Sequence, residues 1–131
     1  MHPAMNPYQT QSVATAGPAQ LVLMLFDRAL VAVARASQAA GTDGRPPALE
    51  TVNHELQRAQ DILTELRVAL DHEQGGDIAA NLDALYDFCI DRLLRANISK
   101  DVSGLAPVTG TLQGLRDAWD EACCKVPVGV A

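Results

Sequence analysis

The sequence predicts an all-α protein, an antiparallel up-down four-helix bundle preceded by an N-terminal arm. Four stretches carry apolar residues at alternating spacings of three and four, which is the pattern of a helix with one buried face. Glycine and proline clusters separate these stretches, and no stretch of comparable length alternates apolar and polar residues as a strand does. Because short connections join helices antiparallel, we expect an arm at 1–17, a bundle at 18–125 and a disordered tail at 126–131.

The composition limits the classes of protein to which the chain can belong. Its 131 residues are most simply one domain, and with 48% apolar but only 4% aromatic residues the core is expected to be aliphatic. A net charge of −6 argues against nucleic acid and anionic lipid as partners. Three cysteines, two of them adjacent, form a poor disulfide framework and therefore favour a reducing compartment.

The first helix is expected to run from Pro18 to about Ala40, with Gly17 as its N-cap. It contains the apolar run Leu21–Phe26, and Asp27 is the first charged residue of the chain. A secretory signal would carry a basic segment before such a run, and this chain has none there. A membrane span needs about 20 apolar residues, and the charges that follow end this run much earlier. The run is therefore expected to belong to a bundle helix, without insertion into a membrane.

This helix carries more apolar residues than one packed face requires. Leu21, Leu25, Ala29 and Val33 are expected to face the core. Apolar residues also occupy other sides of the helix, namely Val22, Leu23, Met24, Phe26, Leu30 and Val31. Because a bundle helix buries only part of its circumference, something else must cover the rest. The candidates are the uncharged arm, anchored by Tyr8 and Val13, or a second protein.

Three further helices follow at about 48–70, 77–97 and from about 103 onwards. The segments GTDGRPP at 41–47 and DHEQGG at 71–76 separate them, and Pro107 is expected in or just after the first turn of the last helix. The expected core stripes are Leu49, Val52, Leu56, Ala59, Leu63, Leu66 and Leu70; then Ile78, Leu82, Leu85, Cys89, Leu93 and Ala96; and finally Leu105, Val108, Leu112, Leu115, Trp119 and Ala122.

The residue patterns do not predict an enzyme. A di-iron site in a bundle needs two Glu-x-x-His pairs, whereas Glu50 and His54 are four apart and no second pair exists. Cys89 lies on an apolar stripe, where a buried thiol is inert, and Cys123 and Cys124 have no histidine nearby in the sequence. Since no phosphate-binding glycine loop is present either, we predict no catalytic residue, no metal and no cofactor.

Three blocks of the sequence occur in a specific order and at specific separations. They are PYQTQSVATAGPAQLVLMLFDRAL at 7–30, GGDIAANLDALYDFCIDRLLRANISKD at 75–101 and LRDAWDE at 115–121. Together they resemble the opening, the third helix and the closing helix of the flagellar export chaperone family FliS. The chain departs from the family pattern at Gly17, where serine is usual, at Phe26, where tyrosine is usual, and at Arg28, where glycine is usual.

The resemblance implies a cytoplasmic helical bundle of the bacterial cytosol with an N-terminal cap. Such a chaperone binds the disordered C-terminal segment of flagellin, prevents premature polymerisation and assists delivery to the type III export apparatus, with the export-gate membrane protein as a further partner. The residues implied to form or cover the flagellin groove are Tyr8, Val13 and Thr15 in the arm, Leu21, Met24 and Leu25 in the first helix, and Asn81, Leu82, Leu85 and Tyr86 in the third. The sequence leaves open which of them contact the partner and which build the core.

Two other hypotheses compete with an export chaperone. The apolar residues that the core does not need could join two copies of the bundle, so that the protein is a homodimer without a client. A metal-dependent bundle enzyme is the third class, although no ligand pattern supports it. The resemblance favours the chaperone, as a monomer or a weak homodimer.

Overall fold

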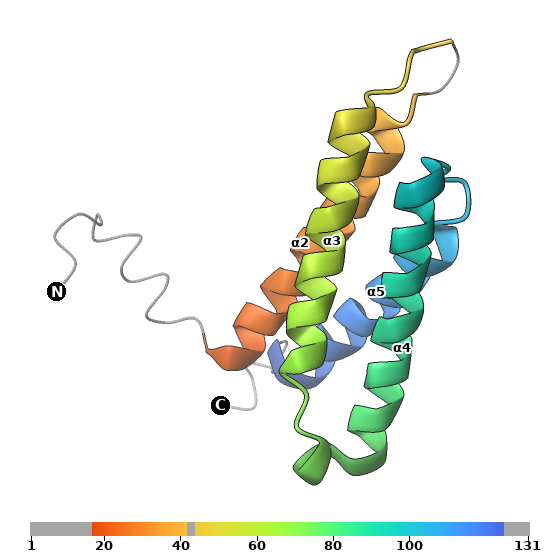
Figure 1. Ribbon diagram of the computed structural model, residues 1–131. Coiled ribbons are helices and arrows are strands. Elements are labelled where there is room, and N and C mark those ends of the chain that lie inside the picture. The colour runs from red at the N-terminus through yellow and green to blue at the C-terminus, as the bar shows by residue number, and fades with distance from the viewer. Residues whose placement is uncertain (1–16, 42–43, 125–131) are drawn as a thin grey trace, which may run out of the picture.

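The computed structural model describes residues 17–41 and 44–124, which form helices and contain no strand. The helices are α2 (Pro18–Ala39), α3 (Leu49–Val68), α4 (His72–Ser99) and α5 (Ala106–Trp119), and a π-helical segment, η1 (Asp120–Cys124), continues the last of them. Consecutive helices run in opposite directions (Figure 1). The predicted all-α four-helix bundle is confirmed. The predicted arm, apart from Gly17, and the tail at 126–131 lie outside the described residues.

α2 begins where the sequence predicts but packs through a different face. Gly17 is its extended N-cap and Pro18 its first residue. The expected core face is wrong at its start, because the side chain of Leu21 is 49% exposed. The residues that α2 buries are Leu23, Phe26, Ala29, Ala32, Val33 and Ala36. Apolar residues surround this helix, so their spacing alone could not fix which side faces the core.

α3 confirms most of its predicted stripe. Val52, Leu56, Ala59, Leu63 and Leu66 are buried on one side of the helix. The first and last residues of the predicted stripe do not belong to the buried face of α3. Leu49 is exposed, and Leu70 lies beyond the last helical residue. Polar residues cover the remaining sides of α3, which is why spacing alone defined its core face.

α4 starts earlier than the sequence predicts. The segment at 71–76 was expected to be a loop, but Asp71 accepts a hydrogen bond from the backbone N–H of Gln74 at 3.0 Å and caps a helical turn at His72. Gly76 then leaves the helical conformation with φ 50°, a value that favours glycine, and regular helix resumes at Asp77. The predicted break is therefore present, but it is a kink between two helical segments.

The first half of α4 also packs in a different register from the predicted one. Ile78 is 71% exposed and Leu85 is 38% exposed, so neither is a core residue. Ala79 and Tyr86 are buried instead, on the same side as Cys89, Leu93 and Ala96. Spacings of three and four allow both choices before Cys89. The ring of Tyr86 decides between them, because it lies beside the Phe26 ring with 6.4 Å between centroids.

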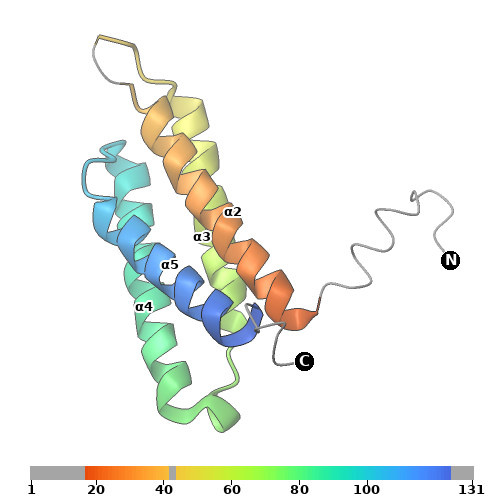
Figure 2. The same ribbon diagram turned by 180° about the vertical axis from the view of Figure 1, so that it is seen from behind.

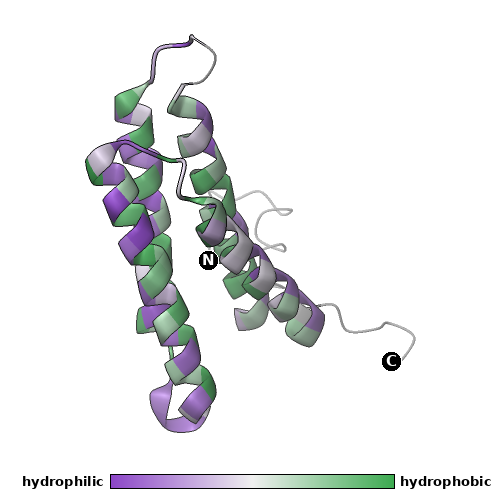
Figure 3. Ribbon diagram, turned by 90° about the vertical axis from the view of Figure 1, so that its right-hand side faces the viewer, coloured by the Kyte–Doolittle hydropathy of each residue, from purple (hydrophilic) through white to green (hydrophobic). Residues whose placement is uncertain are grey.

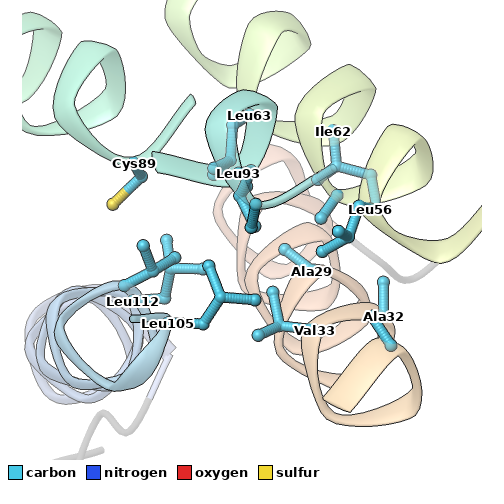
Figure 4. Close-up of a cluster of buried hydrophobic side chains, with 14 of the residues drawn as sticks. Ala29, Ala32, Val33, Leu56, Ile62, Leu63, Cys89, Leu93, Leu105 and Leu112 are labelled. Carbon is cyan, nitrogen blue, oxygen red and sulfur yellow. The ribbon is translucent and has the colours of Figure 1, made fainter. Parts of the chain in front are cut away.

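α5 crosses the bundle from the end of α4 to the start of α2 (Figure 2). It begins at Ala106, later than predicted, because Asp101 accepts hydrogen bonds from the backbone and hydroxyl of Ser103 in a turn before the helix. Pro107 lies in the first turn as predicted. Side chains from all four helices meet in the core, where Leu105 and Leu112 point towards the other helices (Figure 4).

Polar contacts fix the ends of the helices to one another. Near the end of α4 the Asn97 side chain is buried and donates to the Asn53 side chain of α3 at 2.9 Å. Lys100 donates to the side-chain oxygen of Asn97 at 2.6 Å and also to its backbone carbonyl. At the other end, the Trp119 indole donates to the carbonyl of Ala19 at 2.8 Å. Trp119 was predicted as a core residue, and it is half-buried and packs against the core. Its hydrogen bond joins the end of α5 to the first turn of α2.

Adjacent leucines on α4 provide a test of this packing. Leu93 is fully buried and Leu94 is 46% exposed. We expect Leu93→Ala to lower the free energy of unfolding by about 3 kcal/mol, because it removes buried methyl groups and leaves a cavity. Leu94→Ala should change it by less than about 0.5 kcal/mol. Urea unfolding followed by circular dichroism measures both, and equal losses would contradict the register of α4.

Candidate functional site

The described residues offer no catalytic chemistry. Among residues 17–41 and 44–124, no group of His, Cys, Asp and Glu side chains is arranged to hold a metal ion. Burial raises the pKa of the Cys89 thiol to about 11, so this thiol is protonated and unreactive at neutral pH. Burial, with a smaller contribution from Cys89, raises the pKa of Tyr86 to about 12. No helix in the described part of the chain is long and apolar enough to cross a membrane.

α4 instead presents apolar side chains to solvent. Ile78, Leu85 and Phe88 are exposed, and their spacing of seven and three residues places them on one side of the helix together with the exposed Asn81. We call these four residues the α4 apolar flank. Figure 3, which looks onto the side where α4 lies, shows hydrophobic residues interspersed with hydrophilic ones along the helices. A row of exposed apolar side chains of this kind is typical of a protein-binding surface.

Ion pairs show which way the α4 apolar flank faces. On another side of α4, Asp83 and Asp87 bind Arg67 of α3 at 2.7 and 3.0 Å, so that side faces α3. Hydrogen bonds from Arg67 lower the pKa of the Asp83 carboxyl, which keeps this pair ionised at neutral pH. The α4 apolar flank is turned away from α3 and lies on the side of α5.

The α4 apolar flank continues into a polar pocket. The Arg92 guanidinium lies 5.0 Å from the centroid of the Phe88 ring, which is the geometry of a cation–π contact. Further along, Arg92 and Arg95 line a pocket of about 510 Å³ with Ser103 and Leu105 from the connection to α5. This side of α4 therefore presents apolar side chains in the first half of the helix and arginines near its end.

α2 presents a second exposed row. Leu21, Met24 and Val31 are exposed, and Arg28 and Arg35 lie on the same side of the helix at spacings of three and four. We call these five residues the α2 outer row. Its second half lines a pocket with residues of α3, so the row faces the α3 side of α2.

The two surfaces lie on different sides of the bundle. The α4 apolar flank is turned away from α3, whereas the α2 outer row borders α3. The backbones of α2 and α4 are not adjacent in the part of the chain that the structure describes, and the two helices meet only through core side chains such as Phe26 and Tyr86 (Figure 1). A single rigid partner helix therefore cannot bind both surfaces at once.

The structure separates the predicted groove residues into four groups. Tyr8, Val13 and Thr15 lie outside the described residues. Leu21 and Met24 are exposed on the α2 outer row, and Asn81 and Leu85 are exposed on the α4 apolar flank. Leu25 and Leu82 are half-buried and pack against the core. Tyr86 is buried beside Phe26, so it supports the surface from below.

Sequence reasoning did not identify Ile78 and Phe88 as members of one exposed surface. Ile78 was assigned to the core stripe, and Phe88 was not included in any stripe. The helix that restarts after Gly76 places Ile78 in its first turn, where its side chain is exposed. Ile98, 76% exposed at the other end of α4, was missed as well.

Comparison with known proteins finds one family along nearly the whole chain. The family model described as "Flagellar protein FliS" matches residues 1–126. The chain is 38% identical over 120 residues to the flagellar secretion chaperone FliS of Bacillus subtilis (strain 168), covering 89% of this chain and 86% of that protein. It is 37% identical over 115 residues to that of Salmonella typhimurium (strain LT2), covering 87% and 82%. It is 36% identical over 121 residues to the flagellar secretion chaperone FliSB of Pseudomonas aeruginosa, covering 89% and 93%.

The burial of the Tyr86 ring can be tested through the ionisation of its phenol. A Tyr8→Phe variant leaves Tyr86 as the only tyrosine, and absorbance at 295 nm should show it ionising near pH 12. Since the unfolded phenol ionises near pH 10, the free energy of unfolding is unaffected below that pH and falls as the pH rises towards 12. Tyr86→Phe should remove this part of the pH dependence. Ionisation near pH 10 in the folded protein would show that the ring is accessible to solvent.

Proposed function

This chain belongs to the FliS family, a family of flagellar secretion chaperones and not of enzymes, and from that premise we propose that it binds the disordered C-terminal segment of flagellin. The bound segment would be held in the bacterial cytosol, kept from polymerising early and delivered to the flagellar type III export apparatus. The export-gate membrane protein is proposed as a further partner at delivery.

The observation that carries the proposal is the α4 apolar flank. Ile78, Leu85 and Phe88 are exposed, although each is large enough to stabilise a core by burial. An apolar face of a folding segment packs well on such a row, as in other complexes where an amphipathic helix binds an apolar surface. Half-buried Leu82 and the ring of Tyr86 support the flank from the core side and hold its shape.

A disordered client suits the arrangement of the two surfaces. A segment without fixed structure can bind the α4 apolar flank with one part and reach the α2 outer row at Leu21 and Met24 with another, by passing around the bundle. Ordering such a segment costs part of the gross interaction energy, so a large buried surface is required for tight binding. Two separate apolar surfaces supply more area than either surface alone.

The N-terminal arm is proposed to cover the start of α2 when no client is bound. Leu21 and Met24 follow directly on the arm in the sequence, and both are exposed in the described structure. Tyr8, Val13 and Thr15 are proposed to form or cover the groove there, as a cap that the client displaces. Such a cap would protect the apolar residues from non-specific association.

Isothermal titration calorimetry with the C-terminal segment of the cognate flagellin tests the main proposal. We expect a dissociation constant of about 1 μM or lower, and a weakening of about tenfold or more for Leu85→Ser/Phe88→Ser, because two apolar contacts are lost. The matched control is Leu49→Ser/Val68→Ser, which removes two exposed apolar side chains of α3 outside both surfaces. A folded wild-type protein that does not bind, or equal losses for the two double variants, would contradict the proposal.

Deletion of residues 1–15 tests the cap. We expect the shortened protein to bind more of a hydrophobic dye such as ANS than the full chain, since Leu21 and Met24 lose their proposed cover. Leu21→Ser/Met24→Ser in the shortened protein should reverse the increase. Unchanged dye fluorescence after the deletion would show that the arm covers nothing.

The same exposed apolar residues support a second candidate function, a homodimer without a client. In that case Ile78 and Phe88 would pack against a second copy. Light scattering would give twice 13.9 kDa, and the mass of the assembly would not change when flagellin segment is added. A monomer that forms a one-to-one complex with the segment supports the chaperone instead.

A further inference from the structure

The arginines of this protein fall into two groups. Three of them form ion pairs with aspartates of the same or a neighbouring helix, namely Arg67, Arg95 and Arg116. The other five, Arg28, Arg35, Arg45, Arg58 and Arg92, form no ion pair within the described ranges, although acidic residues outnumber basic ones in the chain. Three of these five, Arg28, Arg35 and Arg58, line one pocket between α2 and α3, with a volume of about 240 Å³. We call it the arginine pocket.

The rim of the arginine pocket is set by helix geometry. Arg28 and Arg35 lie two turns apart on the α2 outer row, a separation of about 10 Å along the helix axis. Arg58 approaches from α3, and the apolar side chain of Val31 lies between the two arginines of α2. The carboxylate of Asp27, which also lines the pocket, binds Arg116 of α5 at 2.8 Å and does not neutralise the rim.

The arginine pocket also contains a buried acceptor. Glu55 lines it and is only 7% exposed, and its Oε1 accepts no hydrogen bond from the described residues. No guanidinium of the rim lies within ion-pair distance of this carboxylate. A buried acceptor without a donor is costly in a native protein and is rare. A ligand that completes this pocket would donate a hydrogen bond to Glu55 at its floor and accept hydrogen bonds from the arginines at its rim.

We infer that the arginine pocket binds an acidic segment of a partner protein. Carboxylates of that segment pair with Arg28, Arg35 and Arg58, because the planar guanidinium group can donate two parallel hydrogen bonds to a carboxylate. A backbone N–H or a hydroxyl of the segment, lying between these carboxylates, donates to Oε1 of Glu55. An extended acidic peptide offers both kinds of group at short spacing. Nucleic acid does not fit a chain of net charge −6.

This partner is distinct from the client of the proposed function. The arginine pocket takes in the second half of the α2 outer row, but neither Leu21 and Met24, where the client is proposed to reach α2, nor any residue of the α4 apolar flank lines it, so both can be occupied in one complex. The inference rests on the pocket alone and holds whether or not flagellin binds to α4.

Titration of the ¹⁵N-labelled full chain with an octapeptide of alternating Asp and Ser tests the pocket at low ionic strength, where charge pairs are least screened. We expect saturable amide shifts confined to the neighbourhood of residues 28–35 and 55–58. Arg28→Gln/Arg35→Gln should weaken binding tenfold or more. The matched control, Arg45→Gln/Arg92→Gln, removes two positive charges outside the pocket and should leave binding within twofold.

Two variants isolate the role of the buried acceptor. Glu55→Gln and Glu55→Met both remove the negative charge, but only glutamine keeps an oxygen at this position. We expect the glutamine variant to bind the octapeptide several-fold more tightly than the methionine variant. Equal binding would overturn the assignment of Glu55 as the acceptor for the partner's donor.

Other occupants of the arginine pocket give different results. If inorganic sulfate produces the same shifts with the same dependence on Arg28 and Arg35, the pocket binds small anions only and the inference is overturned. If the shifts instead grow with protein concentration in the absence of peptide, a second copy of the chain is the occupant and the inference is overturned. No shift with millimolar octapeptide also overturns it. Arg58→Gln removes a rim charge on α3, outside the α2 outer row, and should weaken octapeptide binding while leaving the flagellin-segment affinity unchanged, which separates this site from the proposed client surface.

Discussion

The bundle depends on close contact between α2 and α3, where alanines take positions at which larger side chains would hold the helices apart. Ala29, Ala32 and Ala36 are buried on α2, and Ala59 is buried on α3. The leucines and valines beside them then reach α4 and α5 and fill the centre of the bundle (Figure 4). Because α2 packs through this narrow face, the large side chains on its opposite side are left exposed. The exposure of Leu21, Met24 and Val31 thus follows from the packing of the core.

The fold class and the breaks between helices were predictable because they depend on local chemistry. The glycine and proline cluster at 41–47 separates α2 from α3, and most exposed residues of α3 are polar, so its core stripe was predicted almost completely. α2 and the first half of α4 have apolar residues on several sides. For them, the core face depends on partners distant in sequence, such as Phe26 for Tyr86, and spacing alone could not choose it.

The candidate site was less predictable than the fold for a related reason. A match of sequence blocks indicates which segments matter, but it does not say on which side of the bundle each segment lies. The resemblance names Leu21 and Leu85 together, and the structure places their side chains on α2 and α4, whose backbones are not adjacent. The buried acceptor of Glu55 could not be predicted either, since the hydrogen bonds of a side chain depend on tertiary contacts.

The separation of the two apolar surfaces also bears on how such a protein remains soluble. One large exposed patch would promote association of the bundle with itself, whereas two smaller rows on different sides give each copy little area to share with another. The net charge of −6 adds repulsion between copies. A flexible client is not limited in this way. In the proposed complex, binding of the client's first part to the α4 apolar flank would hold its second part at a high effective concentration near the α2 outer row, so that two weak contacts would act as one strong one. The distance between the two surfaces would then favour one long disordered segment over a second copy of the bundle, without any contact that only the client can make.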